Sequence, residues 1–470
     1  FKVTMKLPMS RLPYSALRRG HSSTPEWMWS RAVELARSRR VSQSPKHIAR
    51  ALEDRYMSME WKDRCNFLED LAVRGQVPGA EVQRAVDKYT GSGAEPSTRV
   101  QALRALRESL VPMHERLTAA VIRAGGMGFL LALRGDVLEL VRTARSTGAP
   151  RPELEALDVS IRHHLELSFP EPFLELRRIT YEHSGGAVLE KIARYEAVHP
   201  VRGLEDLKVR LGRGRRCFAF FHPSLPEEPL VFIHVALLPT IASSLRYIAD
   251  NTGDQAMDED SATTAIFYSI TATQPGLSGI DLSNLLIKKV VDTLRQDFPE
   301  LHTFCTLSPI PGLRSWLERS AAAWEEELLA DDESCRALRT AWELLRGDTT
   351  PESPSQQLLG ILGTPAWASP EHQQAQEALR PVLTRLAAHY LAREKRGAYA
   401  LDPVANFHLR NGASLYRVNW LADPSIKGMS NSGGIMVNYL YTLSTMAACT
   451  DQYTQDGTID VAPEVQAHLR

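Results

Sequence analysis

The sequence contains few cysteines and no closely spaced pair of them. Its five cysteines are scattered along 470 residues, and no Cys-x-x-Cys pattern occurs. An odd number of isolated cysteines excludes a disulfide framework and argues against a zinc site. We therefore expect free thiols in a reducing compartment and no bound metal. The positions are Cys65, Cys217, Cys305, Cys335 and Cys449.

Long apolar runs, a strong net charge and the common catalytic signatures are also missing. No apolar run approaches the roughly 20 residues that a membrane span needs, and the formal net charge is −1. We expect neither a nucleic-acid partner nor a membrane partner, because no overall field recruits an anionic surface. The His-Glu-x-x-His, Gly-x-Ser-x-Gly and EF-hand patterns are absent, which removes the common metal and hydrolase interpretations.

The composition is that of an ordinary globular protein, with 43% apolar and 24% charged residues. The length allows two or three domains, each with its own hydrophobic core. Residues 1–23 are basic and poor in acidic side chains, which resembles a transit peptide only weakly. We expect a disordered end there.

The first third of the chain has helical periodicity and no strand pattern. Over residues 25–167 apolar residues recur at helical spacing, for example at Leu103, Leu106 and Leu110. Stretches rich in glycine and proline separate the helices. Helices with a single apolar stripe must pack on one another or on a second subunit. We predict an all-helical bundle domain over residues 1–170 with an oligomerising role.

The stretch from 264 to 311 carries the strongest functional pattern. Residues 265–272 are apolar, β-branched and aromatic, which predicts a buried strand. A glycine loop over residues 273–279 follows, and a helix begins near Leu282. A second strand over residues 301–307 completes a right-handed strand–helix–strand unit. The loop N–H groups and the positive helix end form an anion site, and we expect the anion to be a phosphate.

Further strands flank this unit on both sides. The pattern predicts an α+β chain, in which residues 171–470 form a catalytic domain with a helical insertion at about 317–398. The predicted elements outside the central unit are strands at 174–180, 217–222, 230–237 and 413–422, a helix at 186–197, a turn at 430–434, and a strand or helix at 435–441.

The glycine loop has more than one interpretation. Gln274-x-Gly276-x-x-Gly279 lacks the Gly-Lys-Ser/Thr of a Walker loop. It also lacks the earlier first glycine of a dinucleotide-binding fingerprint. A tight turn that binds nothing and a pyrophosphate loop of an acyl-CoA-binding fold both remain open.

Four other features have two interpretations each. Ser308, at a strand end before two prolines, is either a rigidly held functional hydroxyl or a turn-capping serine. His408 lies between apolar neighbours, as hydrogen-bonded core histidines do. Asp281, in the first turn of the helix after the loop, complements the helix dipole or orients another group. The basic cluster formed by Arg210, Arg213, Arg215 and Arg216 is either a solvated face or a contact for nucleotide phosphates.

Five sequence blocks together resemble malonyl-CoA decarboxylase. They are EAVHP from Glu196, RRCFAFFHPSLPEEPLVFIHVAL from Arg215, IFYSITATQPGLSGIDL from Ile266, SPIPG from Ser308, and YALDPVANFHLRNGASLYRVNW from Tyr399. The resemblance covers residues 188–441, whereas residues 1–170 match only in being helical. It implies a catalytic domain with a GNAT-like acyl-CoA-binding fold. It also implies a homotetramer, a dimer of dimers, formed through the helical domain.

The resemblance further implies a reaction and its site. The reaction is decarboxylation of malonyl-CoA to acetyl-CoA and CO2 without a metal or organic cofactor, since the thioester itself delocalises the enolate. Ser308 is then the hydrogen-bond donor to the developing charge and His408 a proton donor that titrates near neutrality, with Asp281 orienting the pair. The residues expected to bind the CoA thioester are Gln274, Gly276, Ser278, Gly279, Ile280, Asp281, Leu282, Ser283, Asn284, Ser308 and His408.

Two other functions stay open at this stage. One is a GNAT-type acyltransferase in which Tyr439 or Tyr441 protonates the CoA thiolate, and the other is a CoA sensor without turnover. The sequence does not decide between malonyl and methylmalonyl groups, nor whether Ser308 meets the leaving carboxylate or the thioester oxygen.

The last residues are Ala-His-Leu-Arg, not the peroxisomal Ser-Lys-Leu of mammalian family members. We expect a cytoplasmic location in preference to the mitochondrial matrix.

Overall fold

A computed structural model of the chain describes residues 24–37, 43–92, 95–251, 258–329, 331–347 and 353–470. The chain divides into two compact units, residues 1–168 and 169–470. The predicted disordered end at residues 1–23 lies outside the described residues. In the part of the chain that is described, no helix is long and apolar enough to cross a membrane.

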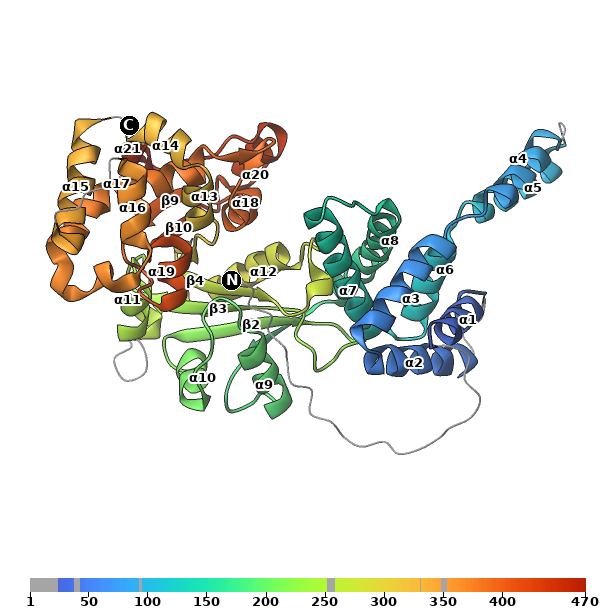
Figure 1. Cartoon of the computed structure of the whole chain (residues 1–470). Helices are drawn as coiled ribbons and strands as arrows, with labels where there is room; N and C mark the ends of the chain where they lie inside the picture. The colour runs from blue at the N-terminus through green and yellow to red at the C-terminus, as the bar shows by residue number, and fades with distance from the viewer. Residues whose placement is uncertain (1–23, 38–42, 93–94, 252–257, 330, 348–352) are drawn as a thin grey trace. The chain divides into compact units, whose positions relative to one another are not determined.

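The described part of the first unit is helical, as the sequence predicts (Figure 1). The apolar stripes face one another, and core side chains such as Phe67, Phe129 and Leu130 are almost completely buried. The helix pair α4 and α5 projects from the rest of this unit, and α4 buries no residue. The helices are α1 (Thr24–Arg37), α2 (Gln43–Ser58), α3 (Trp61–Arg74), α4 (Gly79–Thr90), α5 (Pro96–Ser109), α6 (Met113–Arg123), α7 (Met127–Ser146) and α8 (Pro152–Ser168).

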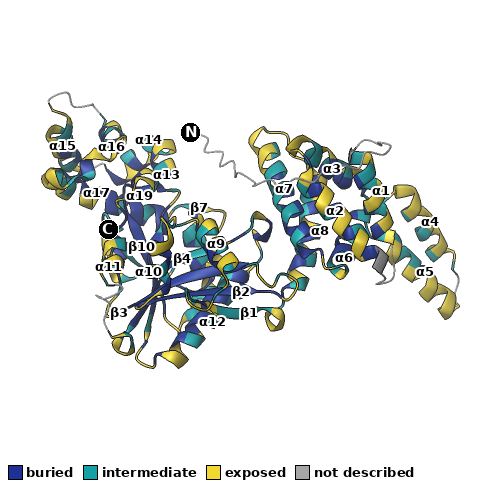
Figure 2. Ribbon diagram, turned by 90° about the horizontal axis from the view of Figure 1, so that it is seen from below, coloured by how far each residue is buried: buried dark blue, intermediate teal, exposed yellow. Residues whose placement is uncertain are grey.

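The second unit is built on one mixed sheet. Strands β2 and β3 are buried along their whole length (Figure 2), because helices cover both faces of the sheet. Helices α9 and α10 lie on one face and α12 on the other (Figure 1). The elements are β1 (Glu175–Ile179), α9 (Gly186–Tyr195), α10 (Leu204–Leu211), β2 (Arg215–Phe221), β3 (Val231–Leu238), α11 (Leu245–Asp250), β4 (Thr264–Ala272), α12 (Leu282–Asp297), β5 (Thr303–Thr306), β6 (Ser308–Pro309), β9 (Ser414–Asn419) and β10 (Met436–Tyr441).

The strand order is β1-β2-β3-β4-β5-β10-β6, and β9 pairs with the other edge of β10. Neighbours are antiparallel except β4 and β5, which are parallel and joined through α12. The predicted strand–helix–strand unit is therefore present. The strands predicted at 217–222 and 230–237 are β2 and β3, and they pair with each other in antiparallel orientation. This arrangement, an all-helical unit followed by a unit with a mixed sheet and helices, confirms the predicted α+β fold class.

Strands β4 and β5 separate at one end, and this separation positions the site. Their pairing ends at Phe267 and Thr306, whereas β4 continues to Ala272. Beyond that point the chain turns away from β4, because Ser308 in β6 pairs with Val437 of β10. A register shift in the β3–β4 pairing also leaves Tyr268 as an extra residue in β4. One edge of β4 is thus left without a neighbouring strand among the described residues.

Helices fill the stretch between β6 and β9. They are α13 (Leu313–Arg319), α14 (Ala321–Leu328), α15 (Asp332–Arg346), α16 (Pro354–Leu362) and α17 (Gln373–Ala392), and a short hairpin of β7 (Lys395–Arg396) and β8 (Tyr399–Ala400) follows. The remaining helices are α18 (Pro403–Arg410), α19 (Ile426–Ser432), α20 (Met446–Asp456) and α21 (Pro463–His468).

Two local predictions need correction or completion. The turn predicted at 430–434 is wrong in part, because helix α19 reaches Ser432 and ends in left-handed Gly433 with φ of 62°. The ambiguous segment at 435–441 is a strand, β10, and all but one of its residues are buried. Its apolar run is typical of buried helices and strands alike, and only its pairing with β5, β6 and β9 decides between them.

Candidate active site

The glycine loop forms a short, irregular connection between β4 and α12. One 3-10 turn spans Pro275–Leu277, and Gly279 adopts a left-handed conformation with φ of 76°. Residues with a Cβ rarely adopt this conformation. The side chain of the N-cap residue forms no hydrogen bond with the first turn of α12. The N–H groups at this helix end can therefore donate hydrogen bonds to an anion.

The predicted binding residues of this loop lie in different environments. Ser283, in the first turn of α12, lines the cavity described below. Leu282 is buried in the core, and the Gln274 amide donates to Glu228 Oε1 over 3.3 Å. Ser278 and Gly279 are exposed. The loop therefore offers backbone and small side chains rather than charged groups.

Asp281 does not contact the predicted catalytic pair. Its side chain is exposed, and its Oδ2 accepts a hydrogen bond from Asn284 Nδ2 over 3.2 Å. Among the described residues, the hydrogen bonds of the His408 ring go to Ser308 and Tyr441 instead. The structure therefore places Tyr441, and not Asp281, beside the His408 ring.

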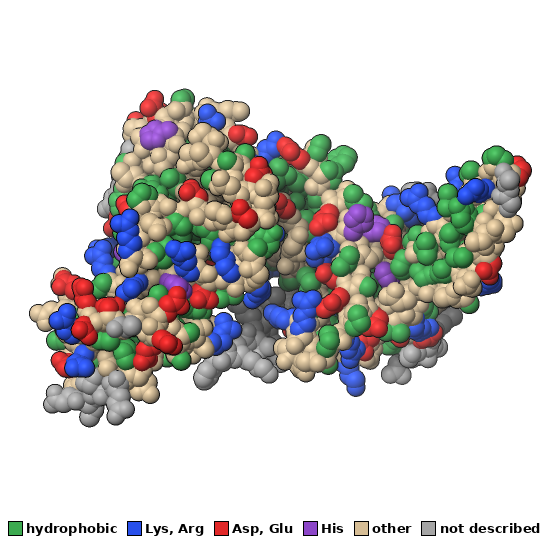
Figure 3. Space-filling view, turned by 90° about the horizontal axis from the view of Figure 1, so that it is seen from above, with side chains coloured by type: hydrophobic (Ala, Val, Ile, Leu, Met, Phe, Trp, Pro, Cys, Tyr) green, Lys and Arg blue, Asp and Glu red, His purple; other side chains and the backbone are tan. Residues whose placement is uncertain are grey.

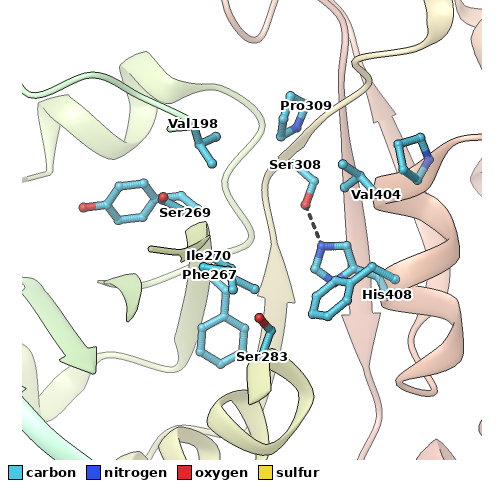
Figure 4. Close-up of a pocket in the computed structure, with 13 residues that line it drawn as sticks. Val198, Phe267, Ser269, Ile270, Ser283, Ser308, Pro309, Val404 and His408 are labelled. Carbon is cyan, nitrogen blue, oxygen red and sulfur yellow. Dashed lines mark hydrogen bonds between the residues drawn. The ribbon is translucent and has the colours of Figure 1, made fainter. Parts of the chain in front are cut away.

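The chain folds so that Ser308 and His408 meet, although they are 100 positions apart (Figure 4). Ser308 Oγ lies 3.2 Å from His408 Nε2, and both side chains are buried. Pairing of β6 with β10 fixes the serine. Helix α18 carries the histidine and is capped by the Asp402 side chain. The sequence made no helix assignment at this position.

A chain of hydrogen bonds runs through this pair. His408 Nδ1 lies 2.7 Å from the Tyr441 hydroxyl. Ser308 Oγ donates to Thr306 Oγ1 over 2.9 Å, and Thr306 Oγ1 also accepts from the N–H of Tyr439. Because the Ser308 proton points to Thr306, we assign the ring proton of His408 to Nε2, with Tyr441 donating to Nδ1.

Burial lowers the pKa of His408 to about 3, whereas the sequence interpretation expected titration near neutrality. Desolvation disfavours the charged imidazolium, and the neighbours of the ring are a serine and a tyrosine rather than a carboxylate. The imidazole is therefore neutral at pH 7, and it acts as an N–H donor through Nε2.

A flat pH profile follows from this depressed pKa. The pH dependence of kcat/KM reports groups of the free enzyme, so we expect no acid limb from His408 between pH 5 and pH 8. Unfolded chains protonate this histidine below about 6.5, so its contribution to stability falls as the pH drops from there toward 3. Steady-state kinetics across this range test the expectation, and an acid limb centred near 6.5 contradicts it.

A cavity of about 300 Å³ opens in front of the pair. It occupies the separation between β4 and the Ser308 turn, and Val198 and Ser269 lie across it from His408 (Figure 4). It extends to Ser283 at the start of α12. The cavity therefore joins the predicted anion site to the hydroxyl and the imidazole.

The basic cluster is not part of this site. Arg215 and Arg216 are buried, so a solvated face is wrong for both. Arg216 forms an ion pair with Glu259 and lies over the ring of Phe298. Phe298 directly follows the carboxyl end of α12, the opposite end from the glycine loop. Nucleotide phosphates bound at that loop are thus out of reach of Arg216.

Sequence reasoning missed several members of the site. Tyr441 was considered only as an acid, and nothing in the sequence indicated its contact with a histidine 33 positions earlier. Thr306 could have been inferred, because it precedes Ser308 by two residues and lies on the same strand side. Val198 lies within the EAVHP block, so that block gave a usable signal. Among the described residues no group of His, Cys, Asp and Glu has the arrangement of a metal site.

Family models match most of the chain. The model for "Malonyl-CoA decarboxylase C-terminal domain" matches residues 172–470, and the model for "Malonyl-CoA decarboxylase N-terminal domain" matches residues 76–169. These matches cover the unit with the cavity from residue 172 and the helical unit from residue 76.

Individual relatives agree with the family models. The rat protein named "Malonyl-CoA decarboxylase, mitochondrial" is 38% identical over 398 residues, which cover 83% of this chain and 77% of the relative. The protein of the same name from Anser anser anser is 39% identical over 373 residues, covering 79% and 72%.

Solved structures are also similar to this chain. Malonyl-CoA decarboxylase from Agrobacterium vitis aligns with a TM-score of 0.75 and 33% identity, covering 94% of this chain and 99% of that one. The Rhodopseudomonas palustris protein aligns with a TM-score of 0.77 and 33% identity, covering 95% and 100%.

Proposed function

Because the chain belongs to the malonyl-CoA decarboxylase family, an enzyme family of carboxy-lyases, we propose that it converts malonyl-CoA to acetyl-CoA and CO2. The observation that carries this proposal is the contact between Ser308 and His408 inside the cavity beside β4. An acyl group can reach both side chains there while its carrier lies along β4 and the glycine loop.

The substrate is held by backbone rather than by charged side chains. The open edge of β4 beyond Phe267 can pair with the amides of the pantetheine arm, as an added strand pairs with a sheet edge. The glycine loop and the N-terminus of α12 then meet the pyrophosphate. Ser283 lies where the arm passes from one region to the other.

The reaction breaks the bond between the α-carbon and the carboxylate. The electron pair stays on the α-carbon and is delocalised onto the thioester oxygen, while CO2 leaves uncharged. The Ser308 hydroxyl, released from Thr306, donates to that oxygen as charge collects there. We thereby place Ser308 at the thioester oxygen rather than at the leaving carboxylate.

The enolate carbon then receives the Nε2 proton of His408. This carbon is a strong base, so a neutral imidazole can serve as the acid. The Tyr441 hydroxyl donates to Nδ1 and stabilises the charge left on the ring. Water restores the proton once acetyl-CoA leaves. Tyr441 therefore orients His408, and its position behind the ring does not favour a role as acid toward a CoA thiolate.

Incubation of the purified chain with malonyl-CoA and no acceptor tests this function. We expect CO2 and acetyl-CoA in equal amounts. Malonyl-CoA that stays intact until an amine is added indicates the acyltransferase, and CoA binding without turnover indicates a sensor. Either result overturns the proposal.

We further propose that the reaction needs no metal and no organic cofactor, because the thioester supplies the electron sink. Exhaustive dialysis against a strong chelator should leave kcat unchanged. Loss of activity that returns with an added divalent cation contradicts this.

The chain also has an apolar surface suited to a second copy of itself. Val100 and Leu103 lie on one side of α5, and Leu110 directly follows this helix. Their side chains are 64%, 52% and 54% exposed. Hydrophobic side chains gather along the projecting α4–α5 pair (Figure 3). We propose that this stripe is covered by a partner subunit in the homotetramer that the resemblance implies, because exposed apolar stripes of this kind mark interfaces.

A single charge in this stripe should break the assembly. Leu103→Asp is expected to give a smaller species in sedimentation or light scattering, because the new carboxylate has to be desolvated in the interface. Leu344→Asp changes a similarly exposed leucine on α15 and should leave the assembly intact. An unchanged mass for Leu103→Asp contradicts the proposed interface.

The five cysteines are all free thiols, which supports a reducing compartment. We propose the cytoplasm, whereas the rat and goose relatives are named mitochondrial. Cell fractionation with detection of the chain decides this, and recovery in the mitochondrial matrix contradicts the cytoplasmic assignment.

A further inference from the structure

One buried carboxylate connects the two segments that carry the catalytic pair. Asp402 is fully buried and precedes α18, the helix of His408. Its Oδ1 accepts from the N–H groups of Val404 and Ala405 over 2.9 and 3.0 Å. These two bonds cap α18 and fix its first turn to the carboxylate.

The second oxygen of the same carboxylate faces the other segment. Asp402 Oδ2 accepts from the N–H of Gly312 over 3.4 Å and from the Tyr390 hydroxyl over 3.4 Å. Gly312 ends the Ser308–Gly312 turn, so this contact reaches the serine segment. Tyr390 lies on α17, so the helices between β6 and β9 take part as well.

Gly312, Tyr390 and Asp402 are closely packed against one another. Gly312 has an ordinary φ of −92°, so its backbone does not require glycine. The requirement is space, because a Cβ at this position is 2.1 Å from the Tyr390 hydroxyl and 3.4 Å from Asp402 Oδ2. The Tyr390 ring in turn packs on Trp316, with 5.3 Å between centroids. The turn, the helix α18 and the helix α17 therefore share one contact point.

We propose that Asp402 is a positioning residue that sets the distance between Ser308 Oγ and His408 Nε2. It ties the serine turn to the histidine helix, and Tyr390 extends this tie to the helical insertion. A carboxylate suits this task because it only accepts hydrogen bonds, and all four of its partners donate. The proposal rests on the proposed function, since it concerns the same pair of side chains.

Asp402→Asn is the direct test. The amide keeps the shape, but its NH2 group meets at least one N–H or O–H donor, which opens the contact to Gly312 or to α18. We expect kcat to fall about tenfold or more, since small misplacements of reacting groups have effects of up to about 100-fold. KM should change less than about twofold, because the proposed CoA-binding residues lie on β4 and the glycine loop.

Asp331→Asn is a control for the loss of a helix cap. Asp331 also caps a helix, α15, by accepting from Ser334 N over 2.7 Å, but it lies outside the cavity. It should lose thermal stability without any change in kcat of the folded protein. If Asp402→Asn behaves like this control, Asp402 is structural only and the proposal is overturned.

A second pair of variants tests the positioning role of Asp402 even if Asp402→Asn fails to fold. Gly312→Ala should lower kcat because its methyl group collides with the Tyr390 hydroxyl. Adding Tyr390→Phe removes the colliding oxygen and should restore much of kcat. Full activity of Gly312→Ala overturns the proposal. An inactive wild-type chain would instead contradict the proposed function. Failure of the positioning proposal and failure of the proposed function are therefore distinguishable.

Discussion

Replacing His408 with glutamine or Ser308 with alanine is expected to lower kcat by about 10²–10⁴-fold. His408→Gln removes the proton donor, and a positioned acid contributes about 10²–10⁴-fold. Ser308→Ala removes the donor to the enolate oxygen, a loss that typically amounts to about 10²–10³-fold in kcat. The affinity for acetyl-CoA should stay nearly constant in both variants, because the pair meets only the acyl end. Steady-state kinetics and calorimetric titration measure the two effects separately.

Controls separate loss of chemistry from loss of folding. Ser355→Ala and His114→Gln remove buried side chains of the same kinds outside the cavity, and they should keep the wild-type kcat. Turnover that survives in Ser308→Ala and His408→Gln means that this pair is not catalytic. A parallel loss of acetyl-CoA affinity means that Ser308 and His408 contribute to CoA binding instead.

Gly279→Val is expected to raise KM about tenfold or more while kcat changes little. Gly279 has φ of 76°, and a β-branched residue held in this conformation costs about 1–3 kcal/mol. Each 1.4 kcal/mol corresponds to about a factor of ten in affinity. The loop relaxes to a shape that no longer presents its N–H groups to the pyrophosphate, and the new side chain obstructs backbone approach. Initial-rate measurements over a range of malonyl-CoA concentrations give both constants.

Gly148→Val is the matched control for backbone strain. Gly148 has a similar φ of 70°, and an added Cβ meets no atom within 4 Å. It lies in the helical unit between α7 and α8, so this variant should be destabilised without any change in KM. If Gly279→Val keeps the wild-type KM, the glycine loop does not bind the pyrophosphate.

The strand pattern was readable because it depends on local sequence. The runs around Ala265–Ala272 and Leu230–Leu237 are apolar and β-branched over the length of a strand, and the structure has β4 and β3 there. Glycines before a helical stripe at Leu282 located the junction between β4 and α12. Periodicity and turn chemistry act over a few residues, so such elements follow from one sequence.

The long-range contacts of the site were not readable in the same way. The Ser308–His408 pair came from the resemblance, because no periodicity joins residues 100 positions apart. The same limit hid the contact of Tyr441 with His408 and that of Asp402 with Gly312. The charge of Arg215 and Arg216 also suggested a solvated face, whereas tertiary packing buries both side chains.

The depressed pKa of His408 illustrates the same limit for chemistry. Its ordinary value predicts titration near neutrality, whereas burial moves the pKa to about 3. Desolvation is a property of the assembled site and not of the residue type. The acid in the proposed mechanism is consequently a neutral imidazole.

A crystal structure of the chain with acetyl-CoA bound tests the central claim most directly. We predict the pyrophosphate at residues 276–279 and the start of α12, the pantetheine arm along the open edge of β4, and the thioester oxygen within hydrogen-bond distance of Ser308 Oγ. An acetyl group bound away from Ser308 and His408, or a pyrophosphate at another surface, contradicts the account.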